Sequence, residues 1–304
     1  MANSNGWGDG SANNAIGWGQ GANNAIGWGD IHADSWAGAT DVVGITTPPV
    51  DADAQAFITA ASITDPTQQS AINTLVVDLK GYNIWTKMKA VYPFVGGTSS
   101  THKFNLKNPL DTDAAFRLVF NGGFTHNSNG ITGNGTNGYA DTKFNPVSQS
   151  SNLNSFFMSV YSRTNSNAGN AYEIANADDY SIGTKFTGII TRYSNNNRYI
   201  AVGGNYNTAN SETDSRGFYC CGTNGSSTQI LYKNGSNVLS GTSPQTGFSN
   251  CNLAVSAVIN LTSIAGYSSK NLAFAHIGDG LTSTEAANLY TTVQTFQTAL
   301  NRNV

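Results

Sequence analysis

The chain has 304 residues, a formal net charge of −3 and only 11% charged residues, against a usual share of about 25%. It contains no run of lysine and arginine, which excludes the electrostatic footprint that nucleic acids require. No segment approaches the roughly 18 apolar residues of a membrane span, and the first residues lack the basic start and apolar stretch of a signal peptide. We therefore expect a soluble protein made in the cytoplasm, without nucleic-acid binding or membrane insertion.

The composition favours a mainly β fold. Asparagine, serine, threonine and glycine are abundant, and these residues suit tight turns between short strands. Aromatic residues make up 11% of the chain, enough to build a hydrophobic core. We expect one main domain with attachments.

The N-terminal segment carries a repeat. The sequence Ala-Asn-Asn-Ala-Ile-Gly-Trp-Gly occurs at residues 12–19 and again at 22–29, so that Trp7, Trp18 and Trp28 are evenly spaced, and Trp36 is a candidate fourth member. Units of this size are too small to bury their tryptophans alone. We predict that residues 1–45 form an attachment or oligomerisation segment, which docks on copies of itself or on another protein. The alternative is a glycine-rich tail.

Residues 46–95 are predicted to form a linker followed by helices. Pro48 and Pro49 stiffen the linker. A first helix has an apolar stripe at Ala54, Phe57, Ile58 and Ala61, and a second begins at an Asp65 cap and ends near Gly81, which makes a helical hairpin. Residues 82–92 continue near helical spacing, and their aromatic and methionine side chains are interpreted as core.

From residue 96 the pattern is typical of short strands separated by turns. We predict a sandwich or jelly roll over residues 96–304. The candidate strands are 102–107, 114–121, 137–144, 155–164, 170–175, 184–193, 198–203, 215–222, 228–233, 251–260 and 270–277.

The chain closes with a strand and a helix. After the last candidate strand, Thr282 and Glu285 have the spacing of a capping box, in which hydroxyl and carboxylate satisfy the free amides of the first turn. One stripe of the following helix is apolar, so it must be covered. Its members are Ala286, Leu289, Tyr290, Val293, Phe296 and Leu300.

Several ordered motifs resemble a family of tailed-bacteriophage virion proteins. These motifs are 82–98, 102–109, 135–142, 230–235 and the closing strand and helix. The resemblance implies a concanavalin A-like (laminin G-like) jelly roll at the C-terminus, while the Gly-Trp repeat is similar to N-terminal attachment segments of phage head or tail fibres. It also implies location in the virion, a homotrimer, and contacts with other virion proteins of capsid, collar or tail.

The sequence lacks the pair of catalytic carboxylates that glycan-cleaving enzymes of this fold require. A glucanase needs two carboxylates on one strand face, but the chain has only three glutamates, at positions 173, 212 and 285, without such partners. Residues 133–138 match the glycine pattern of a dinucleotide site, yet a strand is predicted after them instead of a helix, so we interpret them as a turn. We predict no enzymatic activity and no cofactor.

Metal and cysteine chemistry are also not predicted. The four histidines are scattered, and His276 on a strand is interpreted as a core or interface residue. Asp111 and Asp113 are interpreted as a turn, with a calcium site as the alternative. The three cysteines are predicted to be free and buried, with a bridge from Cys220 or Cys221 to Cys251 as the alternative.

Surface recognition remains as the predicted function. Glycan sites combine an aromatic platform with hydrogen-bonding side chains, and the candidate glycan-binding residues are Arg163, Tyr172, Tyr180, Arg192 and Tyr199. The same residues would suit a solvated sheet face or a subunit interface. We thus expect a fibre or decoration subunit of a virion with a lectin-like outward domain that contacts host-surface polysaccharide. The alternatives are a purely structural capsid- or tail-stabilising module and a glycan hydrolase.

Overall fold

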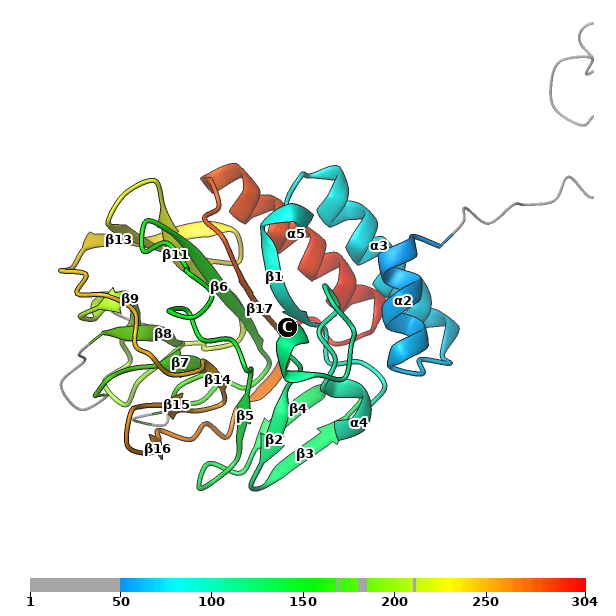
Figure 1. The fold of residues 1–304 in the computed structure, drawn as a ribbon, viewed down its shortest axis with the longest axis horizontal. Coiled ribbons are helices and arrows are strands. Elements are labelled where there is room, and N and C mark those ends of the chain that lie inside the picture. The colour runs from blue at the N-terminus through cyan, green and yellow to red at the C-terminus, as the bar shows by residue number, and fades with distance from the viewer. Residues whose placement is uncertain (1–49, 168, 170, 180–184, 210–211) are drawn as a thin grey trace, which may run out of the picture. The chain divides into compact units, whose positions relative to one another are not determined.

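The computed structural model describes residues 50–167, 169, 171–179, 185–209 and 212–304. Within it, Val50–Val304 is one compact unit. Two sheets lie face to face, and three helices cover the outer face of one of them (Figure 1). The predicted mainly β sandwich with a helical hairpin before it and a helix after it is confirmed. The repeat with Trp7, Trp18, Trp28 and Trp36 lies outside the described residues.

The first sheet, which we call sheet A, is antiparallel throughout. It has eight strands within the described residues, and β6 and β17 lie at its centre. In order they are β13 (Ser236–Thr242), β12 (Thr228–Lys233), β11 (Gly217–Asn224), β6 (Ser155–Ser162), β17 (Asn271–Gly278), β4 (Gly130–Gly133) and β3 (Phe124–Asn127), with β1 (Met88–Tyr92) also paired to β17. Because β1 and β4 follow one another along the same edge of β17, the last strand of the chain joins distant segments.

The second sheet, which we call sheet B, holds nine strands among the described residues. Its path runs through β10 (Asn207–Ala209), β9 (Arg198–Gly204), β8 (Phe186–Ile190), β7 (Ile174–Asn176), β14 (Ala254–Val255), β5 (Tyr139–Asp141) and β2 (Val119–Asn121). The short strands β15 (Val258–Ile259) and β16 (Ile264–Ala265) extend it beside β7, where β15 runs parallel.

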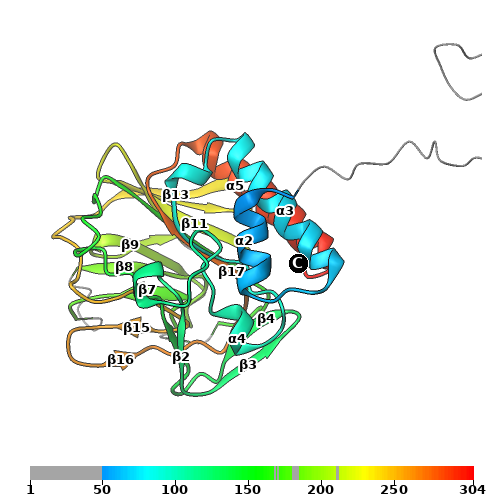
Figure 2. The ribbon, with the colours of Figure 1, turned by 45° about the vertical axis from the view of Figure 1, so that its right-hand side comes forward.

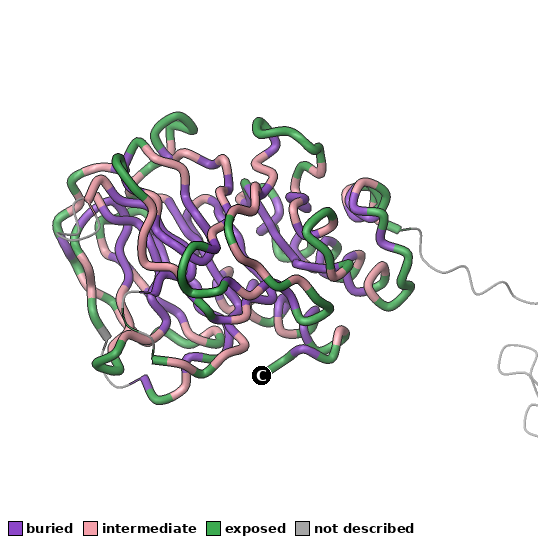
Figure 3. The backbone as a smooth tube through the Cα atoms, turned by 90° about the horizontal axis from the view of Figure 1, so that it is seen from below, coloured by how far each residue is buried: buried purple, intermediate pink, exposed green. Residues whose placement is uncertain are grey.

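Side chains alternate between two cores along the strands of sheet A. On β6, Met158 and Val160 face sheet B, whereas Phe157 and Tyr161 face the helices. The interior strands are buried along most of their length, as Figure 3 shows. Sheet A is therefore covered on both faces, by sheet B and by the helical layer.

The helical layer consists of α2 (Ala52–Ala60), α3 (Pro66–Gly81) and α5 (Ser283–Ala299), which lie side by side in Figures 1 and 2. The predicted caps are present: Asp65 Oδ1 accepts from the Gln68 amide at 2.9 Å, and Thr282 and Glu285 form the capping box. Leu289, Val293 and Phe296 are buried against sheet A. The helices thus form where capping residues and apolar stripes coincide.

Residues 82–92 are not a continuous helix. They form a short 3₁₀ turn, Trp85–Lys87, and then strand β1. Met88, Ala90, Val91 and Tyr92 are all buried, because β1 is covered on both faces. A strand buried on both faces does not alternate, so apolar spacing alone could not separate it from a helix. The prediction that these side chains belong to the core is confirmed.

The predicted strand at 102–107 is wrong. Helix α4 (Ser99–His102) ends there, and the chain then runs beside β1 without forming a ladder. Asn105 is fully buried, and its side chain replaces the missing backbone partners: Oδ1 accepts from the Val91 amide at 2.9 Å, and Nδ2 donates to the Ala115 carbonyl at 3.0 Å. A short polar side chain that bonds to backbone competes with strand formation.

Other predicted strands are shorter than expected, and six of the described strands were not predicted, namely β1, β3, β4, β10, β13 and β16. Residues 114–118 lie outside β2, since a 3₁₀ turn occupies Asp113–Ala115, and 251–260 is broken into β14 and β15 by Ser256 at φ 66°. The hairpin β3–β4 and the edge strand β13 were not predicted. The exposed sequence of β13 lacks an apolar face, which removes the signal.

The three cysteines are free, as predicted, but only Cys220 and Cys221 are buried, whereas Cys251 is half-buried. Cys220 faces the helical layer and Cys221 faces sheet B, as expected for neighbours on a strand. Burial raises the pKa of both thiols. No helix in the described part of the chain is long and apolar enough to cross a bilayer.

Candidate functional site: the tyrosine row of sheet B

The outer face of sheet B carries a cluster of tyrosines. On β9, Ile200 points into the core between the sheets, whereas Tyr199 and Ala201 point outward. The outward cluster contains the buried residues Tyr172 and Phe186, together with three half-buried tyrosines. We call those three, Tyr193, Tyr199 and Tyr206, the tyrosine row.

The rings of the tyrosine row contact one another edge to face. Tyr193 and Tyr199 have centroids 5.5 Å apart at 75°, and Tyr199 and Tyr206 have centroids 5.8 Å apart at 81°. Below them the Phe186 ring lies 4.4 Å from that of Tyr206. Edge-to-face packing on a buried ring fixes each side chain in one orientation.

A hydroxyl pair anchors one end of the row. The Tyr172 and Tyr206 oxygens lie 3.1 Å apart. Burial, together with the neighbouring Tyr172, raises the pKa of Tyr206 well above its usual value. The Tyr206 hydroxyl therefore remains neutral over the physiological range and can both donate and accept.

The hairpin that connects β8 to β9 supports the other end. The Tyr193 amide donates to the Asn197 carbonyl, and the Asn196 amide donates to the Tyr193 carbonyl, both at 2.8 Å. Asn196 has φ 64°, a left-handed conformation that asparagine tolerates. Asn195 Nδ2 donates to the Tyr199 hydroxyl at 2.8 Å. The turn chemistry of Asn195-Asn196-Asn197 thus positions the ring of Tyr199.

Arg192 lies at the base of this hairpin. Its Nε and Nη2 donate to Asn196 Oδ1 at 3.0 and 2.7 Å, and its Nη1 donates to Asn165 Oδ1 at 2.9 Å. Asn165 in turn accepts from the Ser215 amide at 3.1 Å. The guanidinium is therefore held in place by neutral amide oxygens from two separate loops.

The structure brings together three of the five predicted glycan-binding residues. Tyr172 lies in the cluster, though 3% exposed, Tyr199 is the centre of the row, and Arg192 is adjacent to it. The Arg163 side chain points elsewhere, with Nε donating to the Arg302 carbonyl at 2.7 Å. Tyr180 lies outside the described residues.

Tyr193, Tyr206 and Phe186 were not among the predicted glycan-binding residues. Successive side chains of a strand point to opposite faces, so the sequence shows that Phe186, Gly188 and Ile190 share one face of β8, and that Tyr199 and Ala201 share one face of β9. That this face is the one left outside the sandwich follows only from the pairing of the two sheets.

The three glutamates all have structural partners. Glu173 is fully buried beside Lys270, and Glu285 serves the helix cap and pairs with Lys87. Glu212 accepts from Lys233 Nζ at 2.9 Å and from the Tyr219 hydroxyl at 2.9 Å. The pKa of Glu212 is lowered by these hydrogen bonds, which outweigh the opposing effect of burial.

Two buried histidines have strongly shifted pKa values. His276 Nδ1 lies 2.5 Å from Ser159 Oγ under the helical layer, and burial lowers its pKa to about 3. His102 Nδ1 lies 3.0 Å from His126 Nδ1, and burial, His126 and Arg302 lower the pKa of His102 to about 3. The interpretation of His276 as a core residue is confirmed.

The described residues contain no group of three or more histidine, cysteine or acidic side chains that could hold a metal ion. Asp111 and Asp113 instead form ion pairs with Arg117, and Asp111 also pairs with Lys103. The glycine pattern at 133–138 leads from β4 into β5, a turn between strands as predicted.

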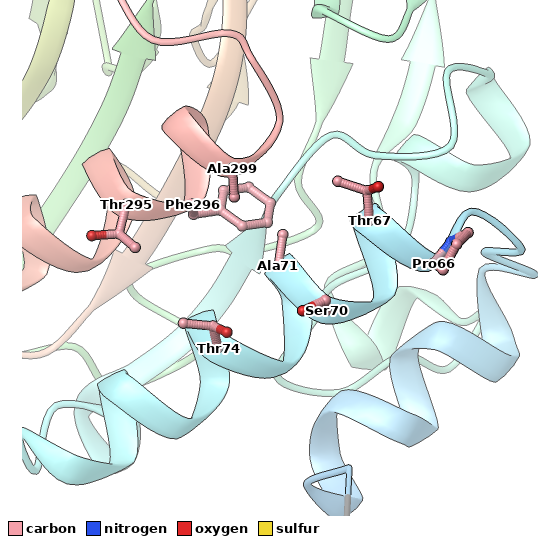
Figure 4. A pocket seen from close by; sticks show the side chains of 8 residues that line it. All are labelled: Pro66, Thr67, Ser70, Ala71, Thr74, Thr295, Phe296 and Ala299. Carbon is pink, nitrogen blue, oxygen red and sulfur yellow. The ribbon is translucent and has the colours of Figure 1, made fainter. Parts of the chain in front are cut away.

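Three cavities of the described surface lie away from the tyrosine row. The smallest, of about 260 Å³, is lined by Asp65, which caps α3, and by Arg302, which donates to backbone carbonyls. A groove of about 470 Å³ lies between α3 and α5, where Phe296 and Ala299 face Thr67 and Ala71 (Figure 4). Its remaining lining is Pro66, Ser70, Thr74 and Thr295, without a titratable side chain. A second hollow of about 530 Å³, near Leu153 and Gln245, is likewise uncharged.

No family profile matches the chain, and no curated protein sequence is similar to it. Solved structures with a similar backbone include domain 4 of AbnA, a GH43 extracellular arabinanase from Geobacillus stearothermophilus, in complex with arabinotriose. It is 13% identical with a TM-score of 0.48, over 67% of this chain and 98% of that one.

Two further similarities concern sialidases. The CBM40 domain of the Ruminococcus gnavus sialidase is 9% identical with a TM-score of 0.36, over 44% of this chain and 82% of that one. A Trypanosoma rangeli sialidase mutant is 10% identical with a TM-score of 0.49, over 75% of this chain and 39% of that one. At these identities, the ligand has to be inferred from the side chains of this chain.

Proposed function

We propose that the protein binds carbohydrate through the tyrosine row of sheet B and displays this domain on the virion of a tailed bacteriophage. The binding proposal rests on one observation: three half-buried tyrosines, held edge to face, lie on the outer face of a sheet beside asparagine amides and an arginine. Sugar rings present an apolar face and a rim of hydroxyls, which such a surface complements.

Rigidity supports this assignment. The row is supported from below by Phe186, at one end by the hydroxyl of Tyr172 and at its centre by Asn195. A prearranged aromatic surface loses little side-chain entropy when a ligand binds. Weak contacts with a sugar ring can then yield measurable affinity.

The virion role rests on the sequence resemblance and on the Gly-Trp repeat. Evenly spaced tryptophans need burial in an assembly, so the repeat is proposed to attach the chain to capsid, collar or tail proteins and to join three copies. The glycan-binding domain would then face the host surface. In this proposal the protein has no catalytic activity.

Binding is tested with a glycan array and then by titration calorimetry on the full chain. Tyr199→Ala is expected to weaken binding about 2- to 10-fold, because ring stacking contributes roughly 0.5–1.5 kcal/mol beyond area burial. Tyr199→Phe keeps the ring and is expected to retain most of the affinity. Tyr82→Ala is the matched control, because Tyr82 is 42% exposed at the end of α3 and outside the row.

If Tyr199→Ala and Tyr82→Ala bind every glycan with equal affinity, the binding site does not include the tyrosine row. An array without any bound glycan would favour the purely structural module. Release of reducing ends from a bound polysaccharide would favour the hydrolase.

Assembly is tested by deleting residues 1–45. The deleted chain is expected to sediment as a monomer and to be missing from purified particles, whereas the full chain sediments as a trimer and is detected in particles by mass spectrometry. A trimer that persists after the deletion would place the assembly contacts in residues 46–304.

A further inference from the structure

The charge of Arg192 has no anionic partner in the described residues. Most lysines and arginines of residues 50–304 form an ion pair with aspartate or glutamate. The ion pairs recorded there leave four cations unpaired, Lys107, Arg163, Arg192 and Arg302.

Three of these four cations have another explanation. Lys107 Nζ lies 4.3 Å from the centre of the Trp85 ring, a cation–π contact. Arg302 is 1% exposed and donates to backbone carbonyls, and Arg163 Nε donates to the Arg302 carbonyl. Arg192 differs, since it is half-buried at the surface, beside the tyrosine row.

The guanidinium of Arg192 is held in place but not saturated. Three of its five N–H groups donate to Asn196 and Asn165, which leaves one N–H on each terminal nitrogen. Two such groups on one planar fork match the two oxygens of a carboxylate. Because the amide oxygens carry no charge, the cation also retains its electrostatic attraction for an anion.

We propose that the glycan bound by the tyrosine row carries a carboxylate, as sialic acids and hexuronic acids do, and that Arg192 receives it. This inference rests on the proposed carbohydrate-binding function. The sugar ring stacks on Tyr193 or Tyr199, and its carboxylate accepts from Nη1 and Nη2 of Arg192. A single arginine selects one charged group on the ligand, which is compatible with the net charge of −3.

The experiment compares matched acidic and neutral sugars by calorimetry on the full chain. One pair is 3′-sialyllactose and lactose, and the other is a hexuronate trisaccharide and its neutral hexose counterpart. The acidic member of one pair is expected to bind about 10-fold more tightly, as a charge-assisted hydrogen bond implies. Its affinity should fall as salt is raised, because the carboxylate and Arg192 are partly exposed to solvent.

Variants assign the effect to Arg192. Arg192→Ala is expected to remove the preference for the acidic sugar over its neutral counterpart. Arg192→Lys keeps the charge without the fork, and should retain part of the preference. Arg216→Ala is the control, since Arg216 is exposed and paired with Asp214.

The outcomes separate this inference from the proposed function. Equal binding of acidic and neutral sugars, with no effect of Arg192→Ala, overturns the carboxylate inference and leaves the tyrosine row as a neutral glycan site. No binding of any sugar overturns the proposed function itself. If Arg192→Ala unfolds, Arg192→Lys serves in its place: a reduced preference for the acidic sugar supports the carboxylate inference, and an unchanged preference overturns it.

Discussion

Lys270 Nζ lies 3.1 Å from Glu173 Oε1, and neither side chain is exposed to solvent. Lys270 immediately precedes β17 in sheet A, and Glu173 immediately precedes β7 in sheet B, so the pair connects the two sheets. Thr191 completes it, accepting from Lys270 Nζ at 2.7 Å and donating its amide to Glu173 Oε2 at 2.8 Å.

Removing one member of this pair should destabilise the sandwich. Lys270→Met leaves the Glu173 carboxylate buried without its cation, and we expect a loss of about 3–5 kcal/mol in the free energy of unfolding. Urea denaturation measures it. The double variant Lys270→Met/Glu173→Leu is the control and should recover much of the loss. A single variant as stable as the parent would show that water reaches the site.

Stability should fall as the pH is lowered below about 6.5. The folded-state pKa values of His102 and His276 are about 3, below the ordinary value of 6.5, so the unfolded chain binds protons first. The stabilisation is complete above pH 6.5 and is lost progressively toward pH 3, at up to about 1.4 kcal/mol per pH unit for each histidine.

Urea midpoints at pH 7.5, 6.0 and 5.0 measure this slope, and that range avoids most carboxylate titration. His276→Gln should reduce the dependence on pH. A parent protein whose stability is constant between pH 6.5 and 5.0 would contradict the assignment of neutral buried histidines.

Arg302 should be essential for docking the C-terminal end of the chain. Its guanidinium donates to the carbonyls of Pro93, Phe94 and Ala273 and to Gln297 Oε1, at 2.7–3.1 Å. Burial lowers the pKa of Arg302 to about 9, so it remains charged near neutral pH.

Arg302→Lys should cost about 3 kcal/mol or more, because an ammonium cannot serve all these acceptors and leaves buried carbonyls unsatisfied. Hydrogen exchange of α5 and β1 measures the effect locally, with Lys89→Arg as a surface control, since Lys89 is an exposed ion-paired side chain. Unchanged exchange in Arg302→Lys would refute this role.

The capping box of α5 should contribute about 1 kcal/mol. Thr282 Oγ1 accepts from the Glu285 amide at 3.2 Å, and Glu285 Oε2 accepts from the Thr282 amide at 2.7 Å. Thr282→Ala removes the first bond and should lower stability by that amount. Thr282→Ser keeps the hydroxyl and should be nearly neutral. Thermal unfolding of the two variants provides the comparison, and equal stabilities would argue against the cap.

Local patterns predicted the elements whose signals lie within a few residues of one another. Asp65, Thr282 and the apolar stripes of α3 and α5 are such signals, and those helices formed as expected. The prediction failed at β1, where four of the five side chains are buried on both faces and the period of two disappears, and at 102–107, where the side chain of Asn105 takes over backbone pairing.

Only part of the candidate site was predicted, because local patterns do not show which residues of different strands lie together. Tyr199 and Arg192 were selected from a loop rich in tyrosine and asparagine, whereas Tyr193 and Tyr206 were not. Composition identifies a recognition surface, but the ring contacts of the row depend on how β8, β9 and the segment after β9 are paired.

The amino-acid sequence alone determined that this protein is a β sandwich with a helical hairpin before it and a capped helix after it, because turn residues, caps and periodicity act between neighbours along the chain. The tertiary structure decided which sheet face stays outside, which glutamate meets Lys270, and that Arg192 meets no carboxylate within the described part of the chain. These relationships join residues far apart in sequence, and only the pairing of strands brings them within bonding distance.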